Sequence, residues 1–186
     1  MQSIFNVEFL SAQIQNQKPL FVNDKIKIEI VESLHWLVRQ QRCTIYGFSI
    51  LPSELNLIWE INPDVRRTDC QGSLFKFTGH MFKKYLEKNE PETLANYLVE
   101  RKDRKYHFWN GNPLIQECWN PKFLENKLYR IHQLPCYPKW NLAKVPEEYH
   151  WSSAAFYKLN DHSFPWLTSY KLIPIHSPSS FAPHNA

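Results

Sequence analysis

Hydrophobic residues recur with strand and helix spacing through the first sixty residues of the chain. Apolar side chains alternate within Ile4–Phe9, which is typical of a half-buried strand. Over Asp24–Gln41 they recur every three or four residues, which predicts an amphipathic helix. Thr44–Leu51 and Glu54–Ile61 are rich in β-formers and are separated by a Pro-Ser pair. The pattern therefore predicts a strand, a helix and an antiparallel hairpin, in that order.

The middle of the chain combines helical spacing with basic residues. A polar loop is predicted over Asn62–Gly72, followed by a helix over Ser73–Lys88 whose outward side is basic. More helix is predicted over Glu92–Val99. A short strand is predicted at Tyr106–Trp109, and the turn residues of Asn110–Pro113 follow it.

The last third of the chain predicts further helices. An Asn-Pro pair at 120–121 opens a helix that ends before Pro135, because the residue before a proline disfavours the α region. A short helix is predicted around Ser152–Tyr157, and a tail rich in Ser, Pro and His is predicted to be disordered from His176. We expect a single domain over residues 1–175, with residues 176–186 as the tail.

The order of these elements indicates an α+β fold. It implies a mainly antiparallel sheet with helices packed mainly on one face, plus a C-terminal helical extension. The hairpin strands are expected to pair in the centre of the sheet, with Asp24–Gln41 and Ser73–Lys88 packed on them. Within the second hairpin strand, apolar side chains occupy one face, while Glu54, Asn56 and Glu60 share the other.

Composition excludes several classes of protein. With 43% hydrophobic and 15% aromatic residues among 186, the chain can build a core and is not intrinsically disordered. Four glycines argue against a glycine-cradled nucleotide site, and the cysteines form no Cys-x-x-Cys pair, which argues against a zinc module. The start of the sequence lacks a signal-peptide pattern, and no eighteen apolar residues run together. We expect a soluble, cytoplasmic protein with reduced thiols and no membrane partner.

Five blocks of the sequence resemble one known family. Residues 46–59 read Tyr-Gly-Phe-Ser-Ile-Leu-Pro-Ser-Glu-Leu-Asn-Leu-Ile-Trp, and four blocks follow at Leu74–Thr78, Tyr106–Pro113, Lys127–His132 and Pro146–Ala154. In this order and spacing, the chain after about residue 43 resembles the REP-associated tyrosine transposases, which are single-strand DNA transposases of the HUH superfamily. Their version of the first block reads Tyr-x-Tyr-Val-Ile-Met-Pro-Asn-His-x-His-Leu. The resemblance implies a ferredoxin-like (RRM-like) transposase fold and a role in DNA transposition and recombination.

The resemblance also implies a metal site and a nucleophile, and the chain departs from both. In the family, two histidines one residue apart and a further polar residue hold Mg²⁺ or Mn²⁺, and a tyrosine attacks the phosphate to form a 5′ phosphotyrosine. Aligning Pro52 with the motif proline puts Glu54 and Asn56 at the histidine positions. Aligning Trp109 with the tryptophan of the family's Trp-Gln-x-x-Tyr pattern puts Pro113 at the tyrosine position. Because proline carries no nucleophile, we expect strand cleavage to be weak or absent.

The strand face shared by Glu54, Asn56 and Glu60 has two interpretations. Two carboxylates and an amide form an all-oxygen set of the kind that holds Mg²⁺. The same residues would also form the polar, solvated face that a half-buried antiparallel strand requires, and we favour this interpretation. No cofactor is therefore expected, and Mg²⁺ or Mn²⁺ would be needed only if the chain is an active enzyme.

Three tyrosines are candidates for a replacement nucleophile: Tyr85, Tyr97 and Tyr106. The first two lie in predicted helical segments, where packing is the default role of a tyrosine ring. Tyr106 lies on a predicted strand. His132 is expected to make a structural hydrogen bond rather than to bind a metal or transfer a proton.

A basic run from Arg101 to Lys105 lies next to the aromatic residues Tyr106, Phe108 and Trp109. Twenty-two Lys and Arg against eighteen Asp and Glu give a formal net charge of +4, which permits a polyanionic partner without requiring one. Single-stranded nucleic-acid sites combine phosphate-binding charge with rings that stack on bases. The predicted DNA-binding residues are Arg101, Lys102, Arg104, Lys105 and Trp109.

Three functions are open at this point. The favoured one is a DNA-binding protein that resembles a tyrosine transposase, binds single-stranded or hairpin DNA, and cleaves it weakly or not at all. The alternative is an active transposase or nickase with a rearranged metal site and another tyrosine. A third is an interaction module that has lost DNA binding as well.

Overall fold

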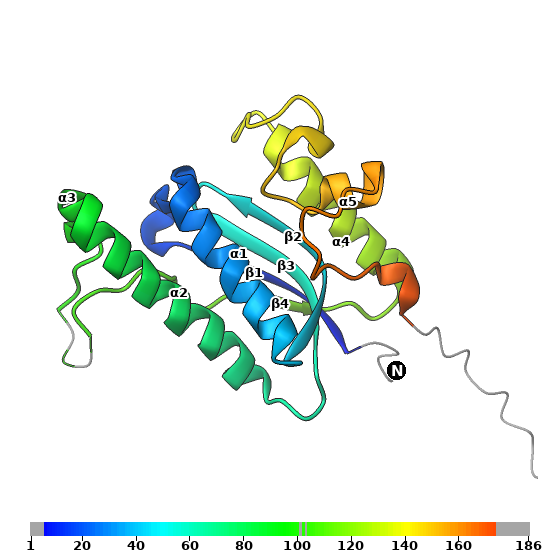
Figure 1. The fold of residues 1–186 in the computed structure, drawn as a ribbon, viewed down its shortest axis with the longest axis horizontal. Helices are drawn as coiled ribbons and strands as arrows, with labels where there is room; N and C mark the ends of the chain where they lie inside the picture. Colours follow the sequence, from blue (N-terminus) through cyan, green and yellow to red (C-terminus); the bar gives the residue numbers. More distant parts are fainter. Residues whose placement is uncertain (1–5, 101, 103, 174–186) are drawn as a thin grey trace, which may run out of the picture.

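The computed structural model describes residues 6–100, 102 and 104–173, and it shows a four-stranded antiparallel sheet with helices packed around it (Figure 1). The strands lie in the order β2-β3-β1-β4, which confirms the predicted α+β fold class. They span β1 (Val7–Gln13), β2 (Cys43–Leu51), β3 (Glu54–Ile61) and β4 (Leu114–Glu117). The α-helices are α1 (Asp24–Arg39), α2 (Arg67–Asn89), α3 (Pro91–Ala95), α4 (Pro121–Gln133) and α5 (Ala154–Leu159). Short 3-10 turns are η1 (Gln15–Gln17), η2 (Leu20–Val22), η3 (Leu134–Cys136), η4 (Pro146–Glu148) and η5 (Tyr170–Leu172).

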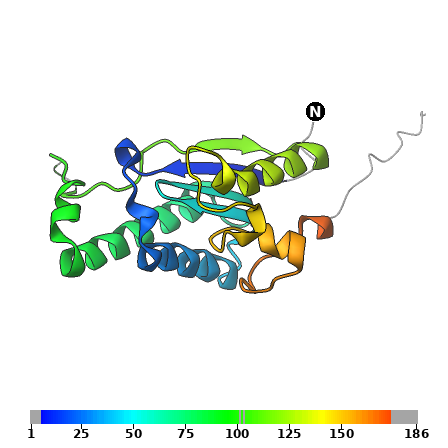
Figure 2. The ribbon, with the colours of Figure 1, turned by 90° about the horizontal axis from the view of Figure 1, so that it is seen from above.

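Helices α1 and α2 pack on one face of the sheet (Figure 2). Leu55, Leu57 and Trp59 of β3 are completely buried in this layer, as their alternation predicts. The side chain of Asn23 accepts a hydrogen bond from the backbone N of Lys25 at 2.9 Å and so caps α1. The hydrophobic cluster on this face has more buried members than the cluster on the opposite face, so it holds the larger share of the core. Fully burying one large apolar side chain contributes about 1.5–3 kcal/mol.

Helix α4 covers part of the opposite face. Phe9 of β1 and Ile58 of β3 are buried in one cluster with Leu128 and Ile131 of α4. Gly47 of β2 permits the close approach, since a Cβ added there would lie 2.4 Å from Cδ1 of Leu128. The predicted C-terminal extension therefore supplies a helix to the second face of the sheet.

The outer edge of β2 is covered by a later part of the chain. The backbone N of Ser153 donates to the carbonyl of Phe48 at 2.9 Å, and the N of Thr168 donates to that of Ile45 at 3.0 Å. These bonds occupy groups that an open edge would offer to another strand. The prediction that both hairpin strands lie in the sheet centre is wrong for β2, because β3 and β1 fill the centre.

Several predicted element boundaries are also wrong. β1 runs on to Gln13, beyond the predicted end at Phe9. α2 begins at Arg67 and not Ser73, because buried Cys70 extends the apolar side of the helix by one turn into the predicted loop. α3 ends at Ala95.

The fourth strand lies at Leu114–Glu117 and not at Tyr106–Trp109. β4 pairs antiparallel with β1, with Leu114 opposite Ser11. The segment 106–109 makes isolated bridges only, from Tyr106 to Leu98 and from Trp109 to Ile14, because it runs beside the turns that follow β1 and α3. It thereby forms a wall next to α2.

The structure also bears on the other sequence predictions about the chain. All four cysteines are free thiols. In the described ranges, none of the helices combines the length and apolar character needed to cross a membrane. The tail predicted from His176 lies outside the described residues.

Candidate nucleic-acid interface

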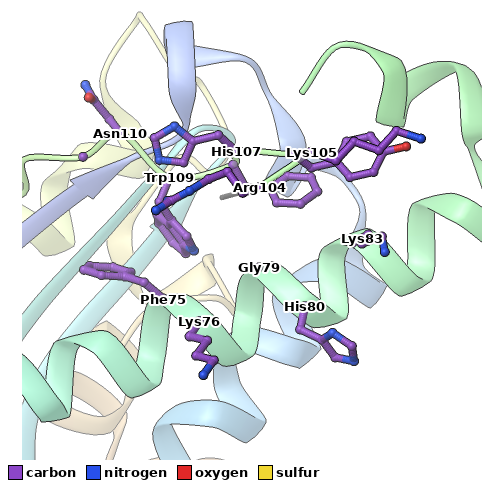
Figure 3. A pocket seen from close by; sticks show the side chains of 13 residues that line it. Phe75, Lys76, Gly79, His80, Lys83, Arg104, Lys105, His107, Trp109 and Asn110 are labelled. Carbon is purple, nitrogen blue, oxygen red and sulfur yellow. The ribbon is translucent and has the colours of Figure 1, made fainter. Parts of the chain in front are cut away.

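A basic, aromatic groove lies between α2 and residues 104–111 (Figure 3). Its volume is about 680 Å³. We call it the basic groove, and its lining residues are Phe75, Lys76, Gly79, His80, Lys83, Arg104, Lys105, Tyr106, His107, Phe108, Trp109, Asn110 and Gly111. No acidic side chain is among them, so the groove suits an anionic ligand.

Helix α2 presents basic residues to the groove because its other side is buried. Buried residues recur every four positions along the helix, from Cys70 to Leu86. Lys76, Gly79 and Lys83 fall on a different side, spaced so that they follow one another along the groove. Figure 3 shows the side chain of Lys76 extending from the rim, with Gly79 leaving the middle of the helix open.

The opposite wall is fixed to the end of β1 by its backbone. The N of Gln15 donates to the carbonyl of Phe108 at 2.7 Å, and the N of Asn110 donates to that of Gln13 at 2.7 Å. The ring of Phe108 is buried, with its centroid 5.8 Å from that of Phe82 on α2. These contacts hold the two walls at a set separation.

Tyr106 lines the groove close to two cations. Nζ of Lys83 lies 5.9 Å from the centroid of its ring, and Nζ of Lys105 lies 5.5 Å from it. Lysines at this distance are attracted to the ring face. The ring is half-buried and so keeps part of its surface for a ligand.

Trp109 is a core residue, and its predicted role as a stacking platform for DNA is wrong. Its side chain is only 6% exposed, and its Nε1 donates to Oγ1 of Thr78 at 2.9 Å. Its ring packs against those of Phe21 and Phe75 at centroid distances of 5.5 and 5.1 Å. A ring that is 6% exposed offers almost no surface to a base, so the half-buried Tyr106 is the better stacking candidate.

The predicted cations are only partly brought into the groove. Arg104 and Lys105 line it, whereas Lys102 is exposed but does not line it. Arg101 lies outside the described residues. Sequence reasoning missed Phe75, Gly79 and Asn110 as lining residues. A glycine at helical spacing between two lysines was the one available signal.

The first two residues at the predicted metal position are bonded to their neighbours. Oε1 of Glu54 accepts hydrogen bonds from Ser11 Oγ at 3.2 Å and from Asn56 Nδ2 at 2.8 Å, and Oε2 accepts from Gln13 Nε2 at 3.5 Å. Asn56 is 1% exposed, so the favoured prediction of a solvated face is wrong at this residue. A cation would have to displace these donors from the carboxylate, and this set does not fit Mg²⁺.

Glu60 does not join that group. It lies six residues farther along β3, which corresponds to about 20 Å at strand spacing. Its Oε2 accepts a 2.6 Å hydrogen bond from the hydroxyl of Tyr46, and burial and this bond raise the pKa of that hydroxyl. A shared metal site of Glu54, Asn56 and Glu60 is therefore wrong. Across the described parts of the chain, no group of three His, Cys, Asp or Glu side chains is placed to hold a metal ion.

The other two tyrosines are engaged in packing. The hydroxyl of Tyr85 accepts a 2.8 Å hydrogen bond from Nδ2 of Asn23, which ties α2 to the start of α1. Tyr97 is buried, and its ring centroid lies 4.8 Å from that of Phe108. Burial raises the pKa of the Tyr97 hydroxyl to about 12. Pro113 directly precedes β4. Of the three candidate tyrosines, only Tyr106 lines the basic groove.

His132 has the structural role that the sequence predicts. Its Nε2 lies 2.8 Å from Oγ of Ser153, and the ring is buried beside Tyr157. Burial lowers the pKa of the imidazole to about 4, which keeps it neutral at pH 7. His132 thus joins α4 to the segment that covers the edge of β2.

Comparisons with known proteins place the fold. The sequence matches no family model and no curated protein. The structure is similar to that of a REP-associated tyrosine transposase bound to a REP hairpin, with a TM-score of 0.59 and 13% identity, over 87% of this chain and 82% of that chain. It is also similar to a candidate transposase from Deinococcus radiodurans R1, with a TM-score of 0.47 and 11% identity, over 68% of this chain and 89% of that chain. The first likeness confirms the transposase fold that the sequence blocks predict.

Proposed function

We propose that this chain is a DNA-binding protein built on the transposase fold, and that its basic groove binds single-stranded or hairpin DNA. The observation that carries the proposal is the placement of Lys83, Lys105 and Tyr106 in one groove. Phosphates of a bound strand pair with the lysines and release counterions, which drives association. The half-buried ring of Tyr106 offers a surface on which a base stacks.

The fold comparison supports DNA as the partner. The similar REP-associated tyrosine transposase is bound to a REP hairpin in its structure. In this chain, the groove lies between a helix and an irregular segment, and none of the described residues that line it is acidic. A single strand or the flank of a hairpin meets such a groove with its phosphates at the lysine-bearing rim.

Cleavage is proposed to be weak or absent. The carboxylate of Glu54 accepts three hydrogen bonds from neighbouring side chains. Pro113 occupies the position that the resemblance assigns to the nucleophile. Loss of one preorganised catalytic group typically costs about 10² to 10³ in rate, and here the metal ligands and the nucleophile are all replaced.

The test of binding is fluorescence anisotropy with a labelled hairpin that carries a single-stranded flank, titrated at several salt concentrations. The triple variant Lys76→Ala, Lys83→Ala, Lys105→Ala should bind more weakly and reduce the slope of log K against log salt by about two to three. A control with the same loss of charge is Lys25→Ala, Lys144→Ala, Lys158→Ala, at exposed lysines that do not line the groove. Equal affinities of the two triple variants would show that the groove is not the binding surface, and no binding by the wild type would favour the interaction module.

An active nickase is the second candidate, and the position of Tyr106 favours it. The hydroxyl belongs to a residue that lines a phosphate-binding groove, next to Lys83 and Lys105. The protein is incubated with the labelled hairpin and Mn²⁺, and denaturing gels are inspected for a covalent protein–DNA band. A band that disappears in Tyr106→Phe would establish the nickase, whereas anisotropy binding without a band supports a non-cleaving protein.

A further inference from the structure

A second hollow lies on the other side of residues 104–111, away from α2. Its volume is about 580 Å³, and it is lined by Gln15, Asn16, Arg104, His107, Asn110, Gly111 and Asn112. Arg104, His107, Asn110 and Gly111 line the basic groove as well, so one segment of chain separates the two. Figure 3 shows Asn110 and His107 pointing away from α2. We call this second space the amide hollow, after its four Asn and Gln side chains.

The amide hollow differs chemically from the basic groove. Among the described residues that line it there is no lysine, aspartate or glutamate, and Arg104 is the one that is formally charged at neutral pH. An amide side chain offers a donor and an acceptor together, which suits the edge of a nucleobase better than a phosphate. Asn and Gln pair in particular with adenine, accepting from its 6-amino group and donating to N7.

One residue that lines the hollow carries an acceptor without a hydrogen-bond partner. Oε1 of Gln15 is buried, and no group of the described residues donates to it. A buried polar atom without a partner is destabilising, so a ligand that donates to it gains affinity. The terminal amide turns on a soft torsion, which allows the oxygen to swing toward a donor in the hollow.

The backbone that frames the hollow is already in place. The N of Gln15 donates to Phe108, and the N of Asn110 donates to Gln13, so the residues on both sides of the hollow are fixed. Asn16 adopts a left-handed conformation with φ of 56°, which asparagine tolerates better than most residues. Preorganised walls reduce the entropy lost when a ligand binds.

We infer that the amide hollow receives one unpaired base of a strand bound in the basic groove, and that it prefers adenine. The inference rests on the proposed DNA-binding function. The basic groove holds the phosphates, Arg104 borders both spaces, and the base turns across the segment 104–111 into the hollow. Affinity then comes from the groove and base preference comes from the hollow.

The test uses twelve-nucleotide oligothymidylate strands in which one central base is thymine, adenine or purine, the last being adenine without its 6-amino group. Wild-type protein should bind the adenine strand about fivefold more tightly than the other two, which corresponds to the lower range of base discrimination by an amide. Gln15→Met, which keeps the side-chain length but removes the amide, should bind all three strands equally while the salt dependence stays unchanged. Gln17→Met is the matched control, since Gln17 lies in the same turn but does not line the hollow.

The outcomes separate this inference from the proposed function. If the wild type binds all three strands equally, or if Gln15→Met keeps the preference, the amide hollow is not a base site although the groove still binds DNA. If the wild type binds none of the strands, both proposals fail. Thermal unfolding checks that each variant is folded. Asn110→Ala, at an exposed position, is a second variant that should lose the preference even if Gln15→Met does not fold.

Discussion

The basic groove and the polar end of β3 both gather charged or amide side chains, yet they differ in what those side chains contact. At β3, Glu54 and Asn56 bond to each other, and Ser11 and Gln13 complete the set. In the groove, Nζ of Lys83 and Nζ of Lys105 lie near the ring of Tyr106, and Lys83 makes an exposed 3.4 Å ion pair with Glu87. Buried polar residues that satisfy one another build the fold, whereas exposed polar residues with weak partners can exchange them for a ligand.

The largest expected effect comes from adding charge to the polar end of β3, where the side chains bond to one another. Asn56→Asp places a second carboxylate next to Glu54 and removes the donor of the 2.8 Å hydrogen bond. We expect the free energy of unfolding to fall by about 3 kcal/mol at pH 7. Repulsion and burial raise the pKa of the new aspartate above its unfolded value, so the loss should shrink as pH falls toward 4. Urea unfolding at pH 7 and pH 4.5 measures both effects.

The exposed substitution Asn112→Asp is the control, and its effect should stay within about 0.5 kcal/mol. Addition of Mn²⁺ provides the opposing result. If the metal stabilised Asn56→Asp but not the wild type, the end of β3 would be a latent metal site and not only a set of side chains that bond to one another.

His132, which joins α4 to the segment over the edge of β2, makes the stability of the fold depend on pH. Its pKa is lowered to about 4 in the folded state, against about 6.5 when unfolded, so the unfolded chain binds the proton more readily. Its contribution to stability is complete above pH 6.5 and is lost as pH falls from 6.5 to 4, by about 3 kcal/mol in total. Urea unfolding of the wild type and His132→Gln across this range should give a flatter profile for the variant. Parallel profiles would show that the imidazole is not buried as described.

Substitutions at two glycines compare the packing between β2 and α4 with the packing in the basic groove. A Cβ at Gly47 meets Leu128 at 2.4 Å, so Gly47→Ala should cost about 2 kcal/mol of stability. A Cβ at Gly79 has its nearest neighbour, Phe108, at 3.9 Å, so Gly79→Ala should be stabilising by about 0.5–1 kcal/mol through helix propensity. Thermal unfolding of the two variants should therefore shift in opposite directions. A loss in Gly79→Ala would mean that the groove is tighter than it is in the structure.

The last expected effect concerns the ring of Tyr106 in the basic groove. Tyr106→Ala should weaken binding of single-stranded DNA about tenfold, because stacking on one aromatic ring is worth about 1–3 kcal/mol per base. Tyr106→Phe keeps the ring and should bind within about twofold of the wild type. Anisotropy titration at fixed salt makes the comparison. A tenfold loss in Tyr106→Phe would assign the contribution to the hydroxyl group instead.

The sequence was sufficient for elements that bury one complete face. The apolar spacing of α1 and of the β2–β3 hairpin led to those elements within a few residues. The packing of α4 on the second face of the sheet could not be predicted from the sequence. That face of β3 carries Glu54, Asn56 and Glu60, with Ile58 as its one apolar residue, so its pattern is that of a solvent-exposed face.

The candidate site was harder to predict, since sharing a face is not the same as proximity. Glu54 and Glu60 lie on the same side of β3, yet a separation of six residues places them about 20 Å apart. Trp109 illustrates a second difficulty. A tryptophan beside a basic run has the same pattern whether its ring stacks on a base or packs in the core, and only the bond to Thr78 decides.

The segment that covers the outer edge of β2 also affects the order in which parts of the fold can form during synthesis. The backbone partners of β2, near Ser153 and Thr168, are synthesised long after the strand they protect. Until they emerge, a growing chain carries an unpaired strand edge, which is the feature that leads nascent proteins into aggregates or to chaperones. The outer edge of β2 can therefore be covered only after the segment that contains Ser153 and Thr168 has been synthesised.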